Sequence, residues 1–353
     1  MKPAAPHPPA KANANAFREA GTSQEDNFIA RYFAPIAGAG GLGLRDDAAL
    51  LKPRSGCELV VTVDTLVAGV HFFADDPPAS IARKALRVNL SDLAAKGADA
   101  AGFVLSFAMP ADTGAVMRTE AWLAAFSAAL GAESVQYTCP LLGGDTVTTP
   151  GPLTLSVTAF GFVPEGRMVL RTGAKAGDLV FVSGSIGDAA LGLQALLNPA
   201  DWCPSLAGVH RDYLVQRYRE PLPRNAVAPV ISAYAHGAMD VSDGLAGDLV
   251  KMMRVSGVSA RIAMQDIPFS EAAQAVFSIN PLMLETALTG GDDYEIVCTV
   301  APENAAEFAA RSLSAGVVVT RIGEVTPAAE HHGVFVDKDN REHLFARGAY
   351  SHF

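Results

Sequence analysis

The chain has 353 residues, of which 50% are hydrophobic and 18% charged, and its 27 basic and 37 acidic side chains leave a net charge of −10. This composition is typical of a folded protein with two ordinary domains or one large one, and it excludes a disordered chain. The acidic balance argues against non-specific nucleic-acid binding. No apolar run reaches the length of about 18 residues that a membrane-spanning helix needs.

The cysteines and the N-terminal segment further restrict the class of protein. Cys57, Cys139, Cys203 and Cys298 lie far apart without a CxxC pair, which argues against a zinc knuckle or a thioredoxin-type site. A disulfide framework is not expected in a chain with so large a potential core. Residues 1–16 are rich in Pro, Ala and Asn and lack the apolar run of a signal peptide. We therefore expect a disordered tail over residues 1–24 and a cytoplasmic protein.

The first half of the chain predicts a domain over residues 25–164. Apolar spacing and β-branched runs predict, in order, a helix near 28–33, a strand at 59–63 ending at Asp64, a helix at 80–96, a strand at 103–108, a helix at 119–130 and a strand at 153–163. The strand and helix patterns alternate. This alternation is typical of α/β or α+β layers.

The second half predicts another domain over residues 165–353. Prolines and glycines punctuate residues 164–177 and mark the boundary. Strands are expected at 179–183, 295–300 and 317–322, a helix at 303–313, and a loop at 202–210. Layers of helices and strands are expected here too.

Aspartates gather at glycine-rich turns and at the ends of apolar runs. They are Asp46, Asp47, Asp64, Asp92, Asp145, Asp240, Asp243, Asp292 and Asp293. Converging carboxylates repel one another unless cations neutralise them. Mg²⁺ prefers such oxygen ligands and usually binds together with phosphates and water. Any one of these aspartates is explained by turn or cap hydrogen bonding alone. Their recurrence at five separate turn sites favours a metal–nucleotide site.

Several common catalytic motifs are missing from the sequence. It contains no GxxxxGK[ST], GxSxG, HExxH or kinase HRD/DFG set. The GAGGLG at 38–43 matches GxGxxG, but no predicted strand precedes it, so a plain linker is the better interpretation. His71 is equally compatible with a core histidine and a substrate contact. Arg167 and Arg171 fit a phosphate contact at the domain boundary as well as they fit a surface pair.

Eight motifs in a fixed order identify a resemblance. They are DDAALL, VDTLVAGVHF, KALRVNLSDLAAKGADA, LLGGDT, GFVPEGRMVLRTGAKAGD, DVSDGL, GGDDYE and GAYSHF. Their order closely resembles the thiamine-monophosphate kinase family, part of the ATP-binding superfamily that includes aminoimidazole ribonucleotide synthetase. The resemblance extends from about residue 25 to residue 353.

The resemblance implies a fold and an activity. The fold is α/β (α+β) with two aminoimidazole-ribonucleotide-synthetase-like domains. The N-terminal domain forms a β-barrel shared between the subunits of a homodimer, and the C-terminal α/β domain packs alongside. The activity is the ATP-dependent phosphorylation of thiamine phosphate to thiamine diphosphate, with ATP as co-substrate and several Mg²⁺ ions. Neither nucleic acid nor a membrane is an expected partner.

The resemblance also assigns roles to residues of this chain. The implied magnesium ligands are Asp47, Thr62, Asp64, Asp92, Asp145, Asp240 and Asp243, of which Asp64, Asp145 and Asp243 are the expected catalytic residues. Gly144, Arg171 and Ser242 match nucleotide contacts. His71, Asp292 and Tyr350 match positions that hold thiamine phosphate.

Three positions depart from the family pattern. Arg45 stands where the family usually has the glycine of GDD, which adds charge and removes backbone freedom. Val63 replaces a frequent hydroxyl residue, so a side-chain ligand is lost there. Asp292 stands where glutamate is common and reaches one methylene less far. None of these changes removes a metal aspartate, so we expect activity to persist.

The expected mechanism is direct in-line transfer of the γ-phosphoryl group without a phosphoenzyme, because the acceptor phosphate is already an anionic nucleophile. Three alternatives remain at this stage. They are a superfamily enzyme that phosphorylates a carbonyl or amide oxygen or makes selenophosphate, a non-catalytic nucleotide-binding partner, and a structural protein with solvated acidic turns.

Overall fold

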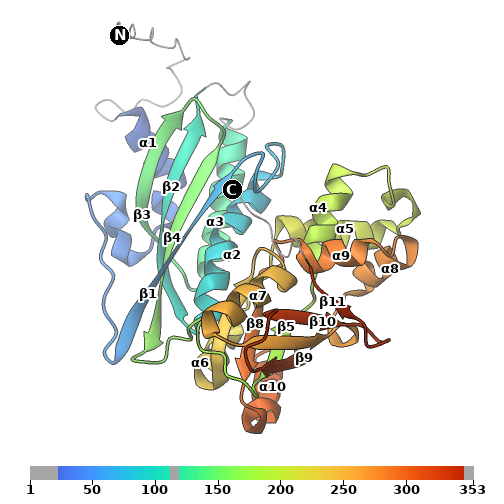
Figure 1. Cartoon of the computed structure of the whole chain (residues 1–353). Helices are drawn as coiled ribbons and strands as arrows, with labels where there is room; N and C mark the ends of the chain where they lie inside the picture. The colour runs from blue at the N-terminus through green and yellow to red at the C-terminus, as the bar shows by residue number, and fades with distance from the viewer. Residues whose placement is uncertain (1–22, 112–118, 346–353) are drawn as a thin grey trace, which may run out of the picture.

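A computed structural model describes residues 23–111 and 119–345 of the chain. Each half of the chain builds its own sheet with packed helices, and the two halves meet along one side (Figure 1). The expected tail lies outside the described residues except at its end, and so does Tyr350. No helix within the two described stretches is long and apolar enough to cross a membrane.

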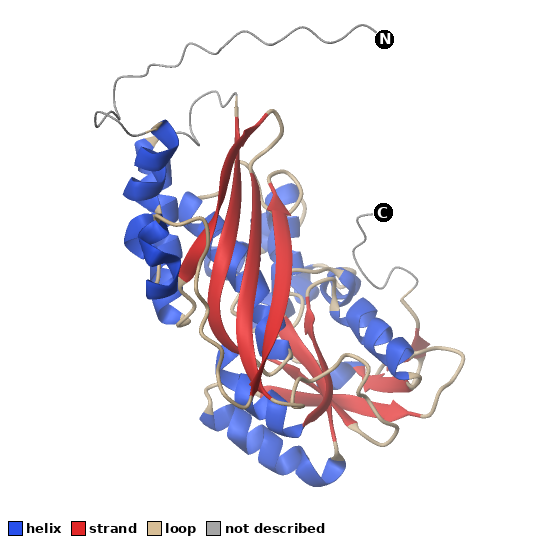
Figure 2. Cartoon of the chain, turned by 90° about the vertical axis from the view of Figure 1, so that its left-hand side faces the viewer, coloured by secondary structure: helices blue, strands red, loops and turns tan. Residues whose placement is uncertain are grey.

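The N-terminal domain contains a long four-stranded sheet. Its strands are β1 (Cys57–Val67), β2 (Asp99–Pro110), β3 (Leu141–Thr149) and β4 (Thr154–Pro164), in the order β1-β4-β2-β3. The strands β1 and β3 therefore form its two edges. The helices of this domain are α1 (Gln24–Tyr32), α2 (Pro78–Ala95) and α3 (Glu120–Gln136). In Figure 2, α2 and α3 lie behind the strands and α1 lies beside them, and no helix of the described residues covers the opposite face.

The uncovered face of this sheet is apolar along the first part of β1. Side chains alternate along β1 because successive residues of a strand point to opposite faces. Val60 and Leu66 are buried on the helix side, whereas Leu59, Val61 and Val63 are 51%, 54% and 59% exposed. Three large apolar side chains in a row on an open face are typical of a surface that another chain covers.

The C-terminal domain contains a seven-stranded sheet in the order β11-β10-β7-β9-β5-β8-β6. Its strands are β5 (Leu179–Ser183), β6 (Ala235–Val241), β7 (Ser259–Ala263), β8 (Glu295–Val300), β9 (Val319–Thr326), β10 (Gly333–Val336) and β11 (Glu342–His343). Its α-helices are α4 (Asp188–Leu197), α5 (Gly208–Arg219), α6 (Ala228–Tyr234), α7 (Leu245–Ser256), α8 (Glu271–Ile279), α9 (Met283–Thr289) and α10 (Ala305–Ser314). The helices α4, α5, α8 and α9 form a lobe with its own small core (Figure 1).

The helix α2 joins the two domains. Ala94 and Ala95 at its end belong to the core of the C-terminal domain. The Lys96 ammonium donates a 2.7 Å hydrogen bond to the Ala238 carbonyl of β6, and the Ser91 hydroxyl donates to the Tyr294 carbonyl at 3.3 Å. The buried face of α2 thus serves both cores, which explains the apolar character of most of its length.

Most predicted elements are confirmed, but two expectations about the aspartates are wrong. The helix expected at 80–96 is α2, and the strand expected at 153–163 is β4. Asp64 does not end a strand: β1 continues three residues further, to Val67. The LLGGDT motif is not a turn, because Asp145 lies inside β3. Asp145 is exposed and Asp64 is half-buried, and each lines a cavity of the structure.

Candidate active site

A cavity of about 650 Å³ lies between the two domains. Seven of the residues expected in the site line it: Asp64, His71, Asp92, Asp240, Ser242, Asp243 and Asp292. The first three come from the N-terminal domain and the other four from the C-terminal domain. Residues separated by more than 200 positions therefore meet in one interdomain cleft.

The N-terminal wall of the cleft is built by β1 and α2. Thr62 and Asp64, two residues apart on β1, point to the same face, toward the helix. The Thr62 hydroxyl donates a hydrogen bond of 2.5 Å to the Asp92 carboxylate. The Asp64 N–H donates to the buried Asn89 side chain at 3.1 Å. Asn89 and Asp92 lie three residues apart on one face of α2. The spacing of the NLSD motif therefore lets both side chains contact β1.

The C-terminal wall is built by the end of β6 and the start of α7. Asp240 lies in β6, and the Asp243 N–H donates to the Asp248 carboxylate at 2.9 Å. The Lys251 ammonium bridges Asp243 and Asp248, with 3.0 Å to the latter. Sequence reasoning missed Asp248 and Lys251. The available signal was their spacing of three on one face of a helix beside the DVSDGL motif.

A glycine allows the GGDDYE loop to close onto this wall. A Cβ atom at Gly291 would lie 2.2 Å from the Ser242 carbonyl oxygen, so only glycine fits. The Asp292 N–H then donates to that same carbonyl at 2.8 Å. Asp292 adopts φ +75°, a left-handed backbone conformation that is uncommon outside glycine. The loop is thereby held tightly enough to aim the Asp292 carboxylate into the cleft.

Burial and mutual repulsion raise the pKa values of two carboxylates of the cleft. Burial, followed by the charges of Asp92 and Asp243, raises the pKa of Asp64 to about 7. Burial also raises the pKa of Asp240, with Asp92, Asp248 and Asp64 adding to the shift and Lys96 opposing it. Among the described residues, neither Asp64 nor Asp92 forms an ion pair within 4.0 Å. The cleft therefore holds more negative charge than its own lysines neutralise.

This donor set fits Mg²⁺ that arrives with phosphates. Within the described parts of the chain, no three His, Cys, Asp or Glu side chains stand close enough to hold a metal ion by themselves. Mg²⁺ usually takes one or two carboxylates and completes its shell with water and substrate phosphates. Carboxylates that face each other across a cleft without touching meet that requirement.

The other end of the cleft carries His71 and Asp292. The His71 Nδ1 atom accepts the N–H of Val67 at 3.0 Å, which places the ring proton of the neutral imidazole on Nε2. Asp292 lies 3.2 Å from the ammonium of Lys84, a lysine of α2 that is only 1% exposed. This end therefore brings an imidazole and a partly neutralised carboxylate together.

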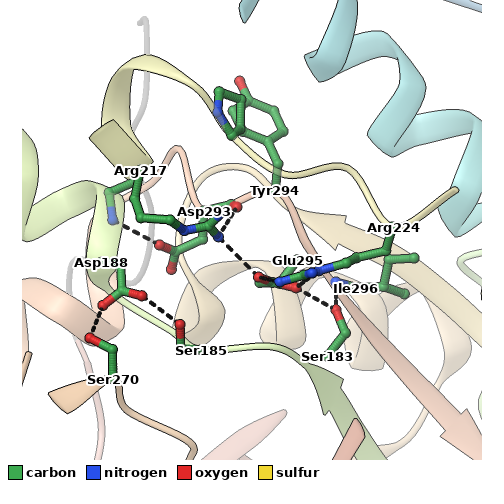
Figure 3. Close-up of polar contacts among 12 residues, drawn as sticks. Ser183, Ser185, Asp188, Arg217, Arg224, Ser270, Asp293, Tyr294, Glu295 and Ile296 are labelled. Atoms are coloured by element: carbon green, nitrogen blue, oxygen red, sulfur yellow. Dashed lines mark hydrogen bonds and ion pairs between the residues drawn. The ribbon is translucent and has the colours of Figure 1, made fainter. Parts of the chain in front are cut away.

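The neighbours of Asp292 in the GGDDYE motif have a different role. Asp293 is fully buried and accepts the N–H groups of Gly187 and Ala189, at 2.6 and 3.1 Å, where α4 begins. Glu295 is also fully buried, and Figure 3 shows it between Arg217 and Arg224. Both acids face protein groups instead of the cleft, so they serve the structure.

A second hollow lies at the far edge of the N-terminal sheet. Its volume is about 390 Å³, and Asp47, Gly144 and Asp145 help to line it. A Cβ atom at Gly144 would lie 1.9 Å from the Leu105 carbonyl oxygen, so this position requires glycine. The structure of one chain therefore divides the expected metal ligands between two hollows.

The register of the sheet separates Asp145 from Asp64. Thr65 pairs with Ser156, Ser156 with Ser106, and Ser106 with Asp145, so this row lies on one face. The Thr65 and Ser156 hydroxyls are hydrogen-bonded at 2.9 Å on that face. It is the uncovered face, opposite to the one that carries Asp64. Within one chain, Asp64 and Asp145 therefore lie on opposite faces and at opposite edges.

The remaining expected residues are placed as follows. Arg171 is exposed and is absent from the lining of the cleft. Arg45 is exposed with φ −115°, a backbone conformation that an arginine adopts without strain. Val63 lies on the uncovered face with Asp145, so the hydroxyl that the family often has there would also point away from Asp64.

The fold and the cleft define a class of proteins. The model of the AIR synthase related protein N-terminal domain matches residues 45–163, and that of the corresponding C-terminal domain matches residues 175–336. A thiamine-monophosphate kinase of Caulobacter vibrioides is 41% identical over 85% of this chain and 83% of its own length. The chain belongs to the thiamine-monophosphate kinase family.

Two solved structures share this architecture. The thiamine-monophosphate kinase of Stenotrophomonas maltophilia K279a has a TM-score of 0.74 and 37% identity over 83% of this chain and 89% of its own. AaThiL complexed with AMPPCP and TMP has a TM-score of 0.72 and 29% identity over 87% of this chain and 91% of its own.

Proposed function

We propose that this chain phosphorylates thiamine phosphate with ATP, giving thiamine diphosphate and ADP. The observation that carries the proposal is the interdomain cleft, where Asp64, Asp92, Asp240 and Asp243 face one another with too few cations. A cleft of this charge suits a reaction that joins two polyanions through metal ions. The support from relatives is equally specific, since one similar structure is a complex with AMPPCP and TMP.

Four carboxylates of the cleft would hold Mg²⁺ in this proposal. They are Asp64 and Asp92 on one wall and Asp240 and Asp243 on the other. When bound, the metal supplies charge neutralisation for the phosphates of both substrates. The Thr62 hydroxyl fixes the orientation of the Asp92 carboxylate, and Ser242 beside Asp243 offers a hydroxyl to the nucleotide.

The transfer itself needs positioning more than proton chemistry. A phosphate oxygen of thiamine phosphate attacks the γ-phosphorus of ATP, the bond between that phosphorus and the β,γ-bridging oxygen breaks, and ADP leaves. The acceptor is an anion near neutral pH, so no general base is required. His71 and Asp292 at the far end of the cleft would orient the acceptor. Direct in-line transfer follows, without a covalent enzyme intermediate.

The proposal includes a homodimer formed through the uncovered sheet face. That face exposes Leu59, Val61 and Val63, and β1 and β3 are edge strands among those described. Edge strands and this apolar part of the open face together favour closure with a second copy into a barrel. Pairing of β1 with β3 of the second copy would place Asp145 of the partner subunit on the strand next to Asp64, with the two side chains on opposite faces of the joined sheet. A cytoplasmic enzyme is part of this proposal.

Product analysis tests the activity. Purified protein is incubated with ATP, Mg²⁺ and thiamine phosphate, and thiamine diphosphate and ADP are measured by mass spectrometry. We expect both products in equal amounts, none without metal, and almost none from Asp243→Asn. Formation of ADP without thiamine diphosphate would overturn the acceptor assignment and direct the search to carbonyl or amide acceptors.

Subunit mixing tests whether the dimer shares its sites. Asp64→Asn and Asp145→Asn are each expected to inactivate the enzyme as pure proteins. If each site takes Asp64 from one subunit and Asp145 from the other, a mixed dimer regains one intact site. Random mixing then restores about a quarter of the wild-type activity, because half of the dimers are mixed. No recovery after verified subunit exchange would show that the sites are not shared.

A further inference from the structure

Lys84 is a buried lysine at the acceptor end of the cleft. It lies in α2 and is only 1% exposed, although lysine is almost never fully buried without partners. Its ammonium donates to the His71 carbonyl at 2.9 Å and lies 3.2 Å from the Asp292 carboxylate. It also lies 3.9 Å from the centre of the Tyr218 ring. Three separate segments of the chain therefore converge on one charged atom.

These contacts connect the two domains at the expected acceptor site. His71 follows β1 in the N-terminal domain, whereas Asp292 belongs to the GGDDYE loop of the C-terminal domain. Lys84 is thus a bridge between the residues expected to hold thiamine phosphate, which themselves lie on opposite walls of the cleft. Their relative positions depend on the ammonium between them.

Tyr218 completes the surroundings of the ammonium. Its hydroxyl donates to the same His71 carbonyl at 3.3 Å. Burial, followed by the charges of Asp292 and Asp76, raises the pKa of Tyr218, which keeps the hydroxyl neutral and able to donate. The ring face adds a cation–π contact, so the lysine charge is balanced by a carboxylate, a carbonyl and an aromatic ring. This environment fixes the ammonium in place.

We propose that Lys84 is a positioning residue of the acceptor site, which holds His71 and Asp292 at a fixed separation and thereby sets the affinity for thiamine phosphate. The inference rests on the proposed function of the cleft. Lys84 itself is absent from the lining of the cavity, so it acts through these two residues. Loss of the ammonium should weaken binding of the acceptor and leave the nucleotide end undisturbed.

The neighbouring residue Arg83 provides a matched control. It lies on the same helix and pairs with Glu220 at 2.8 Å and with Glu133 at 3.5 Å. Arg83 therefore makes ion pairs in the same region, but with acids that are outside the cleft lining. Removing its charge breaks ion pairs of the same helix without touching His71 or Asp292.

Steady-state kinetics of Lys84→Met, Lys84→Arg and Arg83→Met test the proposal. For Lys84→Met we expect the KM for thiamine phosphate to rise about ten- to hundredfold, the range for losing a charged hydrogen bond, with the KM for ATP unchanged within about twofold. Lys84→Arg should recover part of this loss, since it restores the charge. Arg83→Met should leave both KM values within about twofold of the wild type.

Two results would overturn the proposal. One is an unchanged KM for thiamine phosphate in Lys84→Met, and the other is an equal rise in both KM values. If Lys84→Met fails to fold, Lys84→Gln provides the test, because it removes the charge facing Asp292 and keeps a polar side chain that can donate to the His71 carbonyl. A rise in the KM for thiamine phosphate alone supports the proposal there, and no rise rejects it. A wild-type enzyme that forms no thiamine diphosphate rejects the proposed function instead.

Discussion

Two groups of buried or half-buried carboxylates lie close together in this protein, and their surroundings differ. In the cleft, burial and the neighbouring acids Asp92 and Asp243 raise the pKa of Asp64. Behind the cleft, Glu295 accepts hydrogen bonds from Ser183, Arg217 and Arg224, the last through two nitrogens (Figure 3). The comparison shows that an acid with its own partners supports the fold, whereas an acid surrounded by other acids is available to cations.

Adjacent residues illustrate the same difference. Asp292 and Asp293 are neighbours in one motif, yet Asp292 reaches the cleft and Asp293 is fully buried against the first turn of α4. The N-terminus of a helix offers unpaired N–H groups that favour a carboxylate. Two adjacent residues thus have different roles: Asp292 belongs to the candidate site, and Asp293 stabilises the fold.

The largest expected effect is on stability, from Glu295→Gln. Removing one partner of a buried ion pair leaves the arginine charges uncompensated, so we expect the free energy of unfolding to fall by about 3–5 kcal/mol. Urea unfolding measures this change. The exposed Glu307, which pairs with Arg311, is the control, and Glu307→Gln should leave the unfolding midpoint where it is. Equal midpoints for both variants would remove the distinction between the two groups of acids.

Asp64→Asn should lower the activity without lowering the stability, the opposite of the effect expected for Glu295→Gln. We expect turnover to fall by about 10²–10³-fold, the usual cost of losing one electrostatic contact to the transition state. Stability should be unchanged or higher, because one repelling charge is gone from the cleft. Initial rates and thermal unfolding measure the two effects, with the exposed Asp99→Asn as control. A destabilised Asp64→Asn protein of normal turnover would mean that Asp64 is structural.

The third prediction concerns pH in the absence of metal. The pKa of Asp64 is about 7 in the folded protein and near 3.8 when unfolded, so the folded state binds the extra proton between these values. Stability of the chelator-treated protein should therefore fall as pH rises from about 4 to above 7, by up to roughly 4 kcal/mol. Urea unfolding at several pH values measures this fall. Asp64→Asn should reduce this dependence of stability on pH. An equally steep fall in that variant would show that other groups cause it.

The smallest expected effect is that of Arg45→Gly, which restores the residue usual in the family. Arg45 is exposed and its backbone is unstrained, so the change should alter the KM for ATP by no more than about twofold. Steady-state kinetics with ATP varied measures it. A tenfold improvement would show that the arginine obstructs the nucleotide loop.

The sequence predicted the architecture better than the geometry of the site. Apolar periodicity located α2 and β4, because burial on one face leaves a pattern in the chain. The turn pattern by itself did not distinguish Asp292 from Asp293, because that difference depends on where α4 begins in space; only the family resemblance selected Asp292. The residue pattern also interpreted β3 as a turn, since its two glycines resemble turn residues, whereas Gly144 in fact allows a close approach to Leu105 of the neighbouring strand.

The other features that the sequence did not predict depend on contacts between residues far apart in the chain. Lys84 looked like one more polar residue of a helix, and only the fold shows that His71 and Asp292 meet its ammonium. Asp145 was expected beside Asp64, but strand register places the two on opposite faces. Register and tertiary contacts are set by the whole sheet, so no local pattern reports them.

Direct measurement of bound magnesium tests the central claim that the cleft acids are free to take cations. The wild type, Asp64→Asn, Asp240→Asn and the folded fraction of Glu295→Gln are equilibrated with Mg²⁺ and a non-hydrolysable ATP analogue, and the retained metal is measured by mass spectrometry. We predict that both cleft variants retain less metal than the wild type and that Glu295→Gln retains the same amount. Equal retention in all four proteins would contradict the account.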